Sequence, residues 1–342
     1  MPSYSEYKLI EALELVTRYG GLRKAARASG INRSTLSDRL QEARRRFGEG
    51  VPASAPPKVE VIRSVSADSL KRALPRRHLI IPDTQIRADV PTDHLHWIGL
   101  AIVEYRPDVI VHLGDHWDFA SLNSHEKPGS APLENRRYQD DVKSGNDGFE
   151  LLCRPMEEEY RRSGWRPEKH YLMGNHDIRP DRVASDEPRL IGTLTSDHCN
   201  TRDWIRHPYL EIATIDDILY SHFFQSSHSN RAIGGSIPNK ISKIGSSFCH
   251  GHVQGLDMGT KMMANGKTLW GASCGSAYLH EEPYRGAQGQ KHFRGILVFN
   301  EVSGGEFCPM VLSLDYLCRK YTGHSAQQYM AQKYVGQSWG HL

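Results

Sequence analysis

Aspartate, asparagine and histidine residues recur along this chain where short apolar runs end. Carboxylate, amide and imidazole groups offer the oxygen and nitrogen atoms that bind divalent cations. The apolar runs 78–82, 109–113, 169–173 and 218–222 read as strands, and a further apolar segment ends before residue 251. The polar groups at their ends are Asp83, Gly114-Asp115-His116-Trp117-Asp118, Gly174-Asn175-His176-Asp177, His222 and Gly251-His252-Val253-Gln254. The pattern predicts metal-binding residue types at strand ends, where the three glycines let the backbone turn sharply.

These five blocks, in this order, resemble the calcineurin-like metallophosphoesterase family, whose blocks run DxH, GDxxD, GNH followed by D or E, H, and GHxH. The match covers roughly residues 78–300, and five ordered blocks are hard to obtain by chance. The resemblance implies an α/β fold, in which a layered β-sandwich is flanked by helices. It also implies hydrolysis of a phosphate ester with two divalent cations about 3.5–4 Å apart, which supply a hydroxide and neutralise developing negative charge.

The resemblance also assigns roles to individual residues. Asp115 would bridge the two cations, and Asp83 would join it at metal 1. Metal 2 would be held by Asp115, Asn175, His222 and His252. His176 would donate a hydrogen bond or proton to the phosphate or leaving oxygen, while Asp118 would orient this histidine and keep it cationic.

Two departures from the family pattern affect metal 1. The first block reads Asp83-Thr84-Gln85 and the last reads His252-Val253-Gln254, so Gln85 and Gln254 replace the two histidines that serve this metal. An amide oxygen is a hard, neutral ligand, whereas imidazole suits Zn²⁺ and Fe²⁺. We therefore expect a weaker metal 1 site with Gln85 and Gln254 as ligands and Mn²⁺ as the preferred ion, ahead of Mg²⁺, Zn²⁺ or Fe²⁺. The alternative is that metal 1 is lost.

The second block also bears on the substrate. In protein Ser/Thr phosphatases this block continues with Arg-Gly, whereas here it continues with Phe119-Ala120. The nuclease and phosphodiesterase branches of the family lack that arginine. The departure therefore argues against phosphoprotein substrates.

The first 50 residues hold the basic excess of the chain. They contain ten Lys/Arg and six Asp/Glu, while the remainder carries 33 basic and 34 acidic residues. The segment 22–40 within them resembles a helix-turn-helix, with the small Ala26 at the helix crossing, Gly30 at the turn and Asn32 as a helix cap. Leu36 and Leu40 are predicted to face the core.

In that family the second helix lies in the major groove of DNA. The resemblance implies that base edges are met by Arg33, Ser34, Thr35 and Ser37, and phosphates by Arg39, Arg44, Arg45 and Arg46. A helical bundle used for dimerisation or partner docking is the alternative, so a homodimer is possible.

The helices and strands expected around these residues divide the chain into four segments. We predict a helix-turn-helix domain at 1–47, a Gly/Pro-rich linker at 48–77, a metallophosphoesterase domain at 78–314 and a tail at 315–342. Helices are expected at 92–105 and 146–162, a short strand at 59–63, and a strand-rich region at 267–313. The class is therefore α/β with a small all-α domain.

Composition narrows the cellular setting. The mean hydropathy is −0.56, no apolar run approaches a membrane span, and the N-terminus lacks a secretory pattern. The six cysteines form no CxxC pair, so we expect a cytoplasmic protein without membrane contact.

These predictions combine into a metal-dependent phosphodiesterase that acts on DNA, that is a nuclease, tethered by a helix-turn-helix. One alternative is a phosphatase or cyclic-nucleotide phosphodiesterase with a dimerising helical module. The other is a catalytically inactive DNA-binding regulator.

Overall fold

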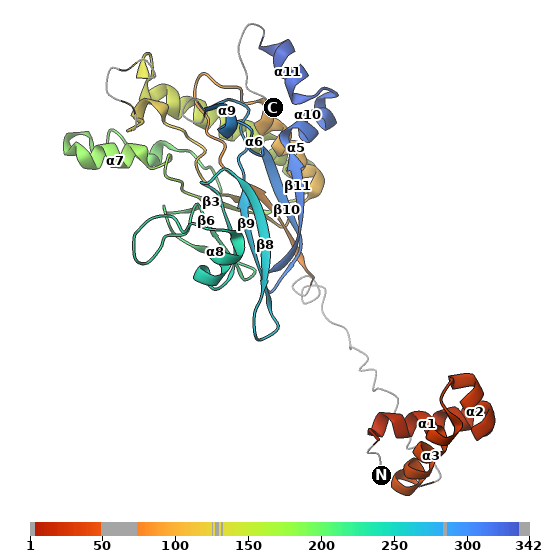
Figure 1. Cartoon of the computed structure of the whole chain (residues 1–342). Helices are drawn as coiled ribbons and strands as arrows, with labels where there is room; N and C mark the ends of the chain where they lie inside the picture. Colours follow the sequence, from red (N-terminus) through yellow and green to blue (C-terminus); the bar gives the residue numbers. More distant parts are fainter. Residues whose placement is uncertain are drawn as a thin grey trace. The chain divides into compact units, whose positions relative to one another are not determined.

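The structure is a computed structural model that describes residues 4–48, 74–124, 126, 130, 133–282 and 286–334 (Figure 1). The chain divides into two compact units, Met1–Arg72 and Ala73–Leu342. Most of the predicted linker, including the strand predicted at 59–63, lies outside the described residues. No described helix has the length and apolar character needed to span a membrane.

The N-terminal unit consists of three described helices: α1 (Glu6–Tyr19), α2 (Leu22–Ser29) and α3 (Arg33–Phe47). Apolar side chains from all three form its core: Leu9, Ala12, Leu13, Ala25, Leu36, Leu40 and Ala43. Gly30 ends α2 in the left-handed conformation (φ 71°), and the side chain of Asn32 accepts a hydrogen bond from the Ser34 amide at the start of α3. The crossing differs from the prediction because Ala25 is fully buried, whereas Ala26 is only partly buried.

The C-terminal unit contains two mixed sheets. The first has the strand order β11-β10-β1-β2-β3-β4, and the second has the order β5-β6-β7-β9-β8. The strands are β1 (Arg76–Ile81), β2 (Val109–His112), β3 (Glu168–Leu172), β4 (Ile205–His207), β5 (Ala213–Ile215), β6 (Ile218–Ser221), β7 (Ser247–His250), β8 (Leu256–Met262), β9 (Thr268–Cys274), β10 (Gly295–Ser303) and β11 (Glu306–Ser313). Strands β1 to β4 run parallel to one another, as do β6, β7 and β9. The pairs β1–β10, β10–β11, β5–β6 and β8–β9 are antiparallel.

Side chains alternate between the two faces of each strand, so the two sheets pack against each other and each is covered by helices on its outer face. The result is four layers: helices, sheet, sheet and helix. Within β1, Leu79 and Ile81 pack toward helices, whereas Ile80 lies in the cluster that joins the two sheets. Helices α5 (Asp93–Tyr105), α6 (Tyr138–Ser163) and α10 (Leu314–Thr322) contribute to the first cluster (Figure 1). Helix α8 (Ile237–Ile244) covers the outer face of the second sheet through Ile237 and Ile241. The predicted α/β class is confirmed.

Both predicted helices are present, and one of them is longer than predicted. Helix α5 matches the predicted helix 92–105, while α6 begins eight residues before the helix predicted at 146–162. The described part of the predicted tail is helical and packed, because α11 (Ala326–Lys333) buries Ala326 and Met330 in the helix-side core. The remaining short helices are α7 (Arg179–Asp186), α9 (Gly286–Gly289), η1 (Ala120–Leu122), η3 (Pro188–Leu190) and η4 (Ser196–His198).

Candidate metal centre

Five of the predicted ligands follow the carboxyl ends of strands. Asp83, Asp115 and Asn175 come after the parallel strands β1, β2 and β3, while His222 and His252 come after the parallel strands β6 and β7. Carboxyl ends of parallel strands meet at one edge of a sheet, which is where open α/β sheets bind ligands. The layered fold therefore carries all five residues to a common edge.

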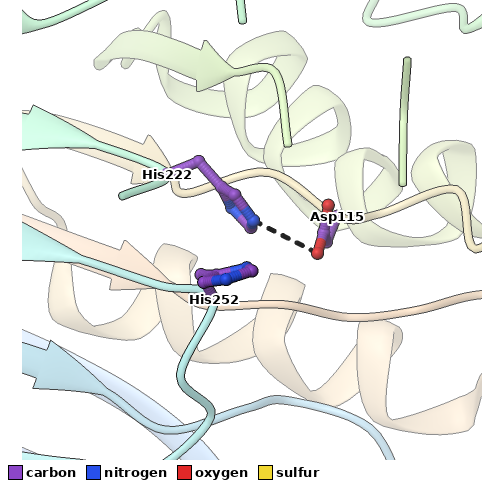
Figure 2. Close-up of side chains that lie close together, drawn as sticks. All are labelled: Asp115, His222 and His252. Atoms are coloured by element: carbon purple, nitrogen blue, oxygen red, sulfur yellow. Dashed lines mark ion pairs between the residues drawn. The ribbon is translucent and has the colours of Figure 1, made fainter. Parts of the chain in front are cut away.

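Four of these side chains touch one another directly. His222 Nε2 lies 3.2 Å from Asp115 Oδ2 and 2.9 Å from Asn175 Oδ1, and His252 Nδ1 lies 2.8 Å from the same amide oxygen. Figure 2 shows His222 and His252 directed toward Asp115. Among the described residues, Asp115, His222 and His252 are the one group of three acidic, histidine or cysteine side chains whose ligand atoms lie within 4.8 Å of each other. We call Asp115, Asn175, His222 and His252 the His half of the centre.

The charges in the His half are strongly coupled. Burial alone would lower the pKa of His222, but the carboxylates of Asp115 and Asp83 raise it to about 9. Burial opposes ionisation of Asp115, yet the adjacent His222 and His176 hold its pKa well below the usual range. Burial and the charge on His222 lower the pKa of His252 to about 4. A proton on His222 thus balances a buried carboxylate where a cation could do so instead.

The Gln half of the centre, which we define as Asp83, Gln85 and Gln254, is arranged differently. Asp83 Oδ1 accepts a hydrogen bond from the His252 amide at 3.0 Å, and Asp83 Oδ2 accepts one from Gln254 Nε2 at 3.3 Å. The Gln254 oxygen in turn accepts a hydrogen bond from the Tyr278 hydroxyl at 2.8 Å. Burial and the nearby Asp115 raise the pKa of Asp83 to about 6.

The two glutamines predicted as ligands therefore differ. Gln254 presents its nitrogen to Asp83 and its oxygen to Tyr278, so in this conformation it does not offer an oxygen to a cation. Gln85 is 1% exposed, and its side-chain oxygen is buried without a hydrogen-bond partner. Such an orphaned acceptor costs about 1–3 kcal/mol, which a bound cation would relieve. The donor set fits a cation at Gln85 better than at Gln254.

The predicted acid and its orienting carboxylate are in contact. His176 Nδ1 lies 2.6 Å from Asp118 Oδ1, and His176 Nε2 lies 3.9 Å from Asp115 Oδ2. Burial alone would lower the pKa of His176, but Asp115 and Asp118 raise it. Burial would raise the pKa of Asp118, yet its bond to His176 lowers it. The pair thus favours a cationic imidazole beside the bridging carboxylate.

Two arginines that the sequence analysis missed also contact Asp118. Arg179 donates from NH1 to the Asp118 backbone oxygen at 2.6 Å, and its NH2 lies 3.3 Å from His176 Nε2. Arg87 NH1 lies 3.5 Å from Asp118 Oδ2 and 3.4 Å from Glu282. Arg179 comes three residues after His176, so proximity in the sequence is a signal that could have found it.

Asp177 organises both loops and was also missed. Its buried carboxylate accepts hydrogen bonds from five donors: the amides of Gly174, Asp115, His116 and Trp117, and the hydroxyl of Tyr171. These bonds tie the loop after β2 to the loop after β3. They hold Asp115 and Asn175 in register, which explains why an acidic residue ends the third block.

The three glycines predicted at strand ends, Gly114, Gly174 and Gly251, serve two purposes. Only Gly114 has a positive φ (92°). A Cβ on Gly174 would lie 2.1 Å from Asp115 Oδ1, and one on Gly251 would lie 2.5 Å from Asp83 Oδ1. Gly174 and Gly251 therefore do not use the positive φ that glycine permits, and there the missing side chain makes room for a carboxylate.

Strained backbone gathers at the centre instead. Asp115, His252, Gln85 and Gln254 adopt positive φ values of 52°, 65°, 41° and 58°. Each such residue costs about 1–3 kcal/mol, and outliers of this kind cluster at functional sites. The strain falls on proposed ligands in both halves.

Other histidines near the centre are structural. His112 and His116 are fully buried and both lie close to the Thr84 hydroxyl, at 3.3 and 2.7 Å. Neither belongs to the Asp115 cluster. His125, also considered at the second block, lies outside the described residues.

A cleft of about 570 Å³ lies at the centre. It is lined in part by Asp115, Asn175, His176 and His252, and by Arg179 and Arg182 of α7. The volume suits a ligand of nucleotide size, since small-molecule pockets occupy about 300–1,000 Å³.

The predicted DNA-binding residues lie on α3 and differ in accessibility. Arg33, Ser34, Arg44, Arg45 and Arg46 are exposed, whereas Thr35, Ser37 and Arg39 are half-buried. Arg39 faces Glu11 at 3.5 Å, while Arg45 and Arg46 share Glu42 at 2.7 and 2.8 Å. Within the described part of the chain, Arg33 and Arg44 have no carboxylate at ion-pair distance.

Comparison with known proteins adds no family. Neither a protein-family model nor a curated protein matches the chain. Solved structures do match, and one of them is similar over 70% of this chain and 100% of its own chain, at 14% identity and a TM-score of 0.27. A likeness of this strength carries no argument about fold or function.

Proposed function

We propose that this chain is a metal-dependent phosphodiesterase that acts on DNA through a metallophosphoesterase-type centre. The observation that carries the proposal is the His half, which lies beside the His176–Asp118 pair. Its buried carboxylate, two imidazoles and amide oxygen each lie within 3.2 Å of another ligand atom of the group. This donor set suits a divalent cation. An acid next to such a centre suits hydrolysis of a phosphate ester.

The residues of the centre divide the work. Asp115, Asn175, His222 and His252 would hold one cation, and Asp83, Gln85 and Asp115 a second, preferably Mn²⁺. When bound, the cations would supply a nucleophilic hydroxide and neutralise charge on the phosphate. The Nδ1–H of His176 donates a hydrogen bond to Asp118, which orients Nε2 toward Asp115 and the cleft. From there His176 can protonate the leaving oxygen.

The N-terminal unit would act as a helix-turn-helix that holds DNA. The exposed Arg33 and Ser34 lie in the first turn of α3, where this class of domain meets base edges. Arg44 lies in the last turn, without a carboxylate partner among the described residues, and suits a phosphate contact. Tethering through the linker would raise the local concentration of DNA at the centre.

Plasmid nicking with Mn²⁺ tests both parts. We expect wild type to nick, His176→Ala to lose at least about 100-fold in rate, and residues 73–342 alone to nick more weakly. The Arg33→Ala, Arg44→Ala double variant should bind duplex DNA more weakly and with a shallower salt dependence. No nicking by wild type with any of Mn²⁺, Mg²⁺, Zn²⁺ or Fe²⁺ would contradict the proposal.

A further inference from the structure

One face of α7 lines the cleft. Its members recur at helical spacing and are Arg179, Arg182, Val183 and Asp186. Arg179 is committed to Asp118 and His176 at the start of the helix. Arg182 lies one turn further along and is exposed, so it is accessible to a ligand.

Arg182 stands apart from the other arginines near the centre. Arg87, Arg136 and Arg179 each lie within 4 Å of a carboxylate, namely Glu282, Asp89 and Asp118. In the described part of the chain Arg182 has no such partner. Its hydrogen bond goes to the neutral Tyr209 hydroxyl at 3.2 Å, and its guanidinium lies 5.4 Å from the centre of the Tyr209 ring. The guanidinium is thus held in place without being neutralised.

Aromatic rings connect Arg182 to the metal centre. The Tyr209 ring packs edge-on against Phe223 with centroids 6.0 Å apart, and Phe223 lies 4.7 Å from the ring of His252. Arg182 is therefore at most two rings away from a proposed ligand. Phosphates follow one another at about 3.4 Å of axial rise along a nucleic-acid strand, so a strand held at the centre has further phosphates within this reach.

We propose that Arg182 binds a phosphate next to the one being cleaved, and so selects a polynucleotide strand over a small diester. This inference rests on the proposed function, because it takes the centre to be the place of cleavage. A guanidinium fixed on a ring loses little freedom on binding and pairs well with phosphate. Arg182 lines the same cleft as His176 and Asp115.

Charge in the cleft makes this contact depend on metal. Asp115, Glu126 and Asp186 line the cleft together with Arg179, Arg182 and the cationic His176, so the metal-free cleft has no excess of positive charge. Divalent cations at the centre would add the positive charge that draws a polyanion into the cleft. Arg182 then acts as a specificity residue of the loaded centre.

The test compares Arg182→Gln with Arg189→Gln in the full chain. Arg189 is a matched control, since its side chain is 82% exposed, pairs with Glu187 and does not line the cleft. Each variant is assayed with Mn²⁺ on a single-stranded hexanucleotide and on bis(p-nitrophenyl) phosphate. The hexanucleotide carries several phosphates but no duplex for the N-terminal unit to read. Hexanucleotide binding is also measured by fluorescence anisotropy.

We expect Arg182→Gln to lower kcat/KM on the hexanucleotide about tenfold, mainly through KM, and to leave bis(p-nitrophenyl) phosphate unchanged. Its hexanucleotide affinity should fall with a salt slope smaller by about one. Equal loss on both substrates, or hexanucleotide kinetics and binding like those of Arg189→Gln, would overturn the inference. If wild type hydrolyses neither substrate, the proposed function fails, while the anisotropy comparison still decides whether Arg182 binds the strand.

Discussion

The two halves of the metal centre share one edge of the fold but are built from different donors. In the His half, Asp115, Asn175, His222 and His252 meet side chain to side chain. In the Gln half, the protein itself satisfies Asp83 through the His252 amide and Gln254. Without a cation, the His half holds a compensating proton on His222, and the Asp83 carboxylate of the Gln half has internal hydrogen bonds. We infer that the halves bind metal with unequal strength, and that the His half is the tighter.

Loss of the shared carboxylate should have the largest effect. Asp115→Asn keeps the side-chain volume but removes the charge that we propose both halves share. We expect Mn²⁺ affinity to fall by about 100-fold or more and hydrolysis to reach background, because a cation loses its anionic ligand. Metal content by mass spectrometry and calorimetric titration measure this. Asp197→Asn, at a carboxylate that is 86% exposed, should retain both properties.

We expect metal affinity to depend on pH differently in the two halves. His222 has a pKa of about 9, so below that pH a cation must displace a proton, and affinity at the His half should rise up to about tenfold per pH unit until about pH 9. Asp83 has a pKa of about 6, so affinity at the Gln half should rise only up to about pH 6 and then level off. Titrations at pH 7.5 in buffers of different ionisation enthalpy count the protons. Equal proton release by both metals would contradict this assignment.

The sequence was informative about which residues gather and less so about what each one does. Asp83, Asp115, Asn175, His222 and His252 follow strands, and strand ends could be predicted because apolar runs of four to six residues are a local signal. The use of Gln254 could not be predicted. It depends on Tyr278, which is close only after the second sheet has formed, and on which end of the amide that hydroxyl contacts.

The same limit appears in the fold. The α5 helix was predicted within a residue because its apolar face is continuous, whereas the first eight residues of α6 were missed. That stretch, Tyr138–Gly145, is mostly polar, and its helical state depends on tertiary contacts such as the close approach of Gly145 to the Trp117 ring. In the N-terminal unit, spacing predicted Leu36 and Leu40 as core residues but did not distinguish Ala25 from Ala26.

Restoring imidazole to the Gln half should have an intermediate effect. In a Gln85→His, Gln254→His double variant we expect Zn²⁺ affinity at the Gln half to rise about tenfold, because imidazole suits Zn²⁺ better than an amide oxygen does. Both positions have positive φ, which histidine accepts more readily than most residues. Stoichiometry by calorimetry measures the change, with the exposed Gln225→His as control. Unchanged Zn²⁺ stoichiometry and affinity would mean that the Gln half is not a metal site.

The smallest expected effect comes from Tyr278→Phe, which changes no proposed ligand. Removing the hydroxyl frees the Gln254 oxygen from its 2.8 Å hydrogen bond, so the amide can turn that oxygen toward a cation beside Asp83. We expect Mn²⁺ affinity at the Gln half to rise about threefold, while the free energy of unfolding falls by about 1–2 kcal/mol because a buried hydrogen bond is lost. Tyr220→Phe is the matched control, since that buried hydroxyl contacts His78 at 2.8 Å, away from the centre. If both variants lose stability and neither gains affinity, Gln254 serves only to hold Asp83, and the prediction that its oxygen can reach a cation is wrong.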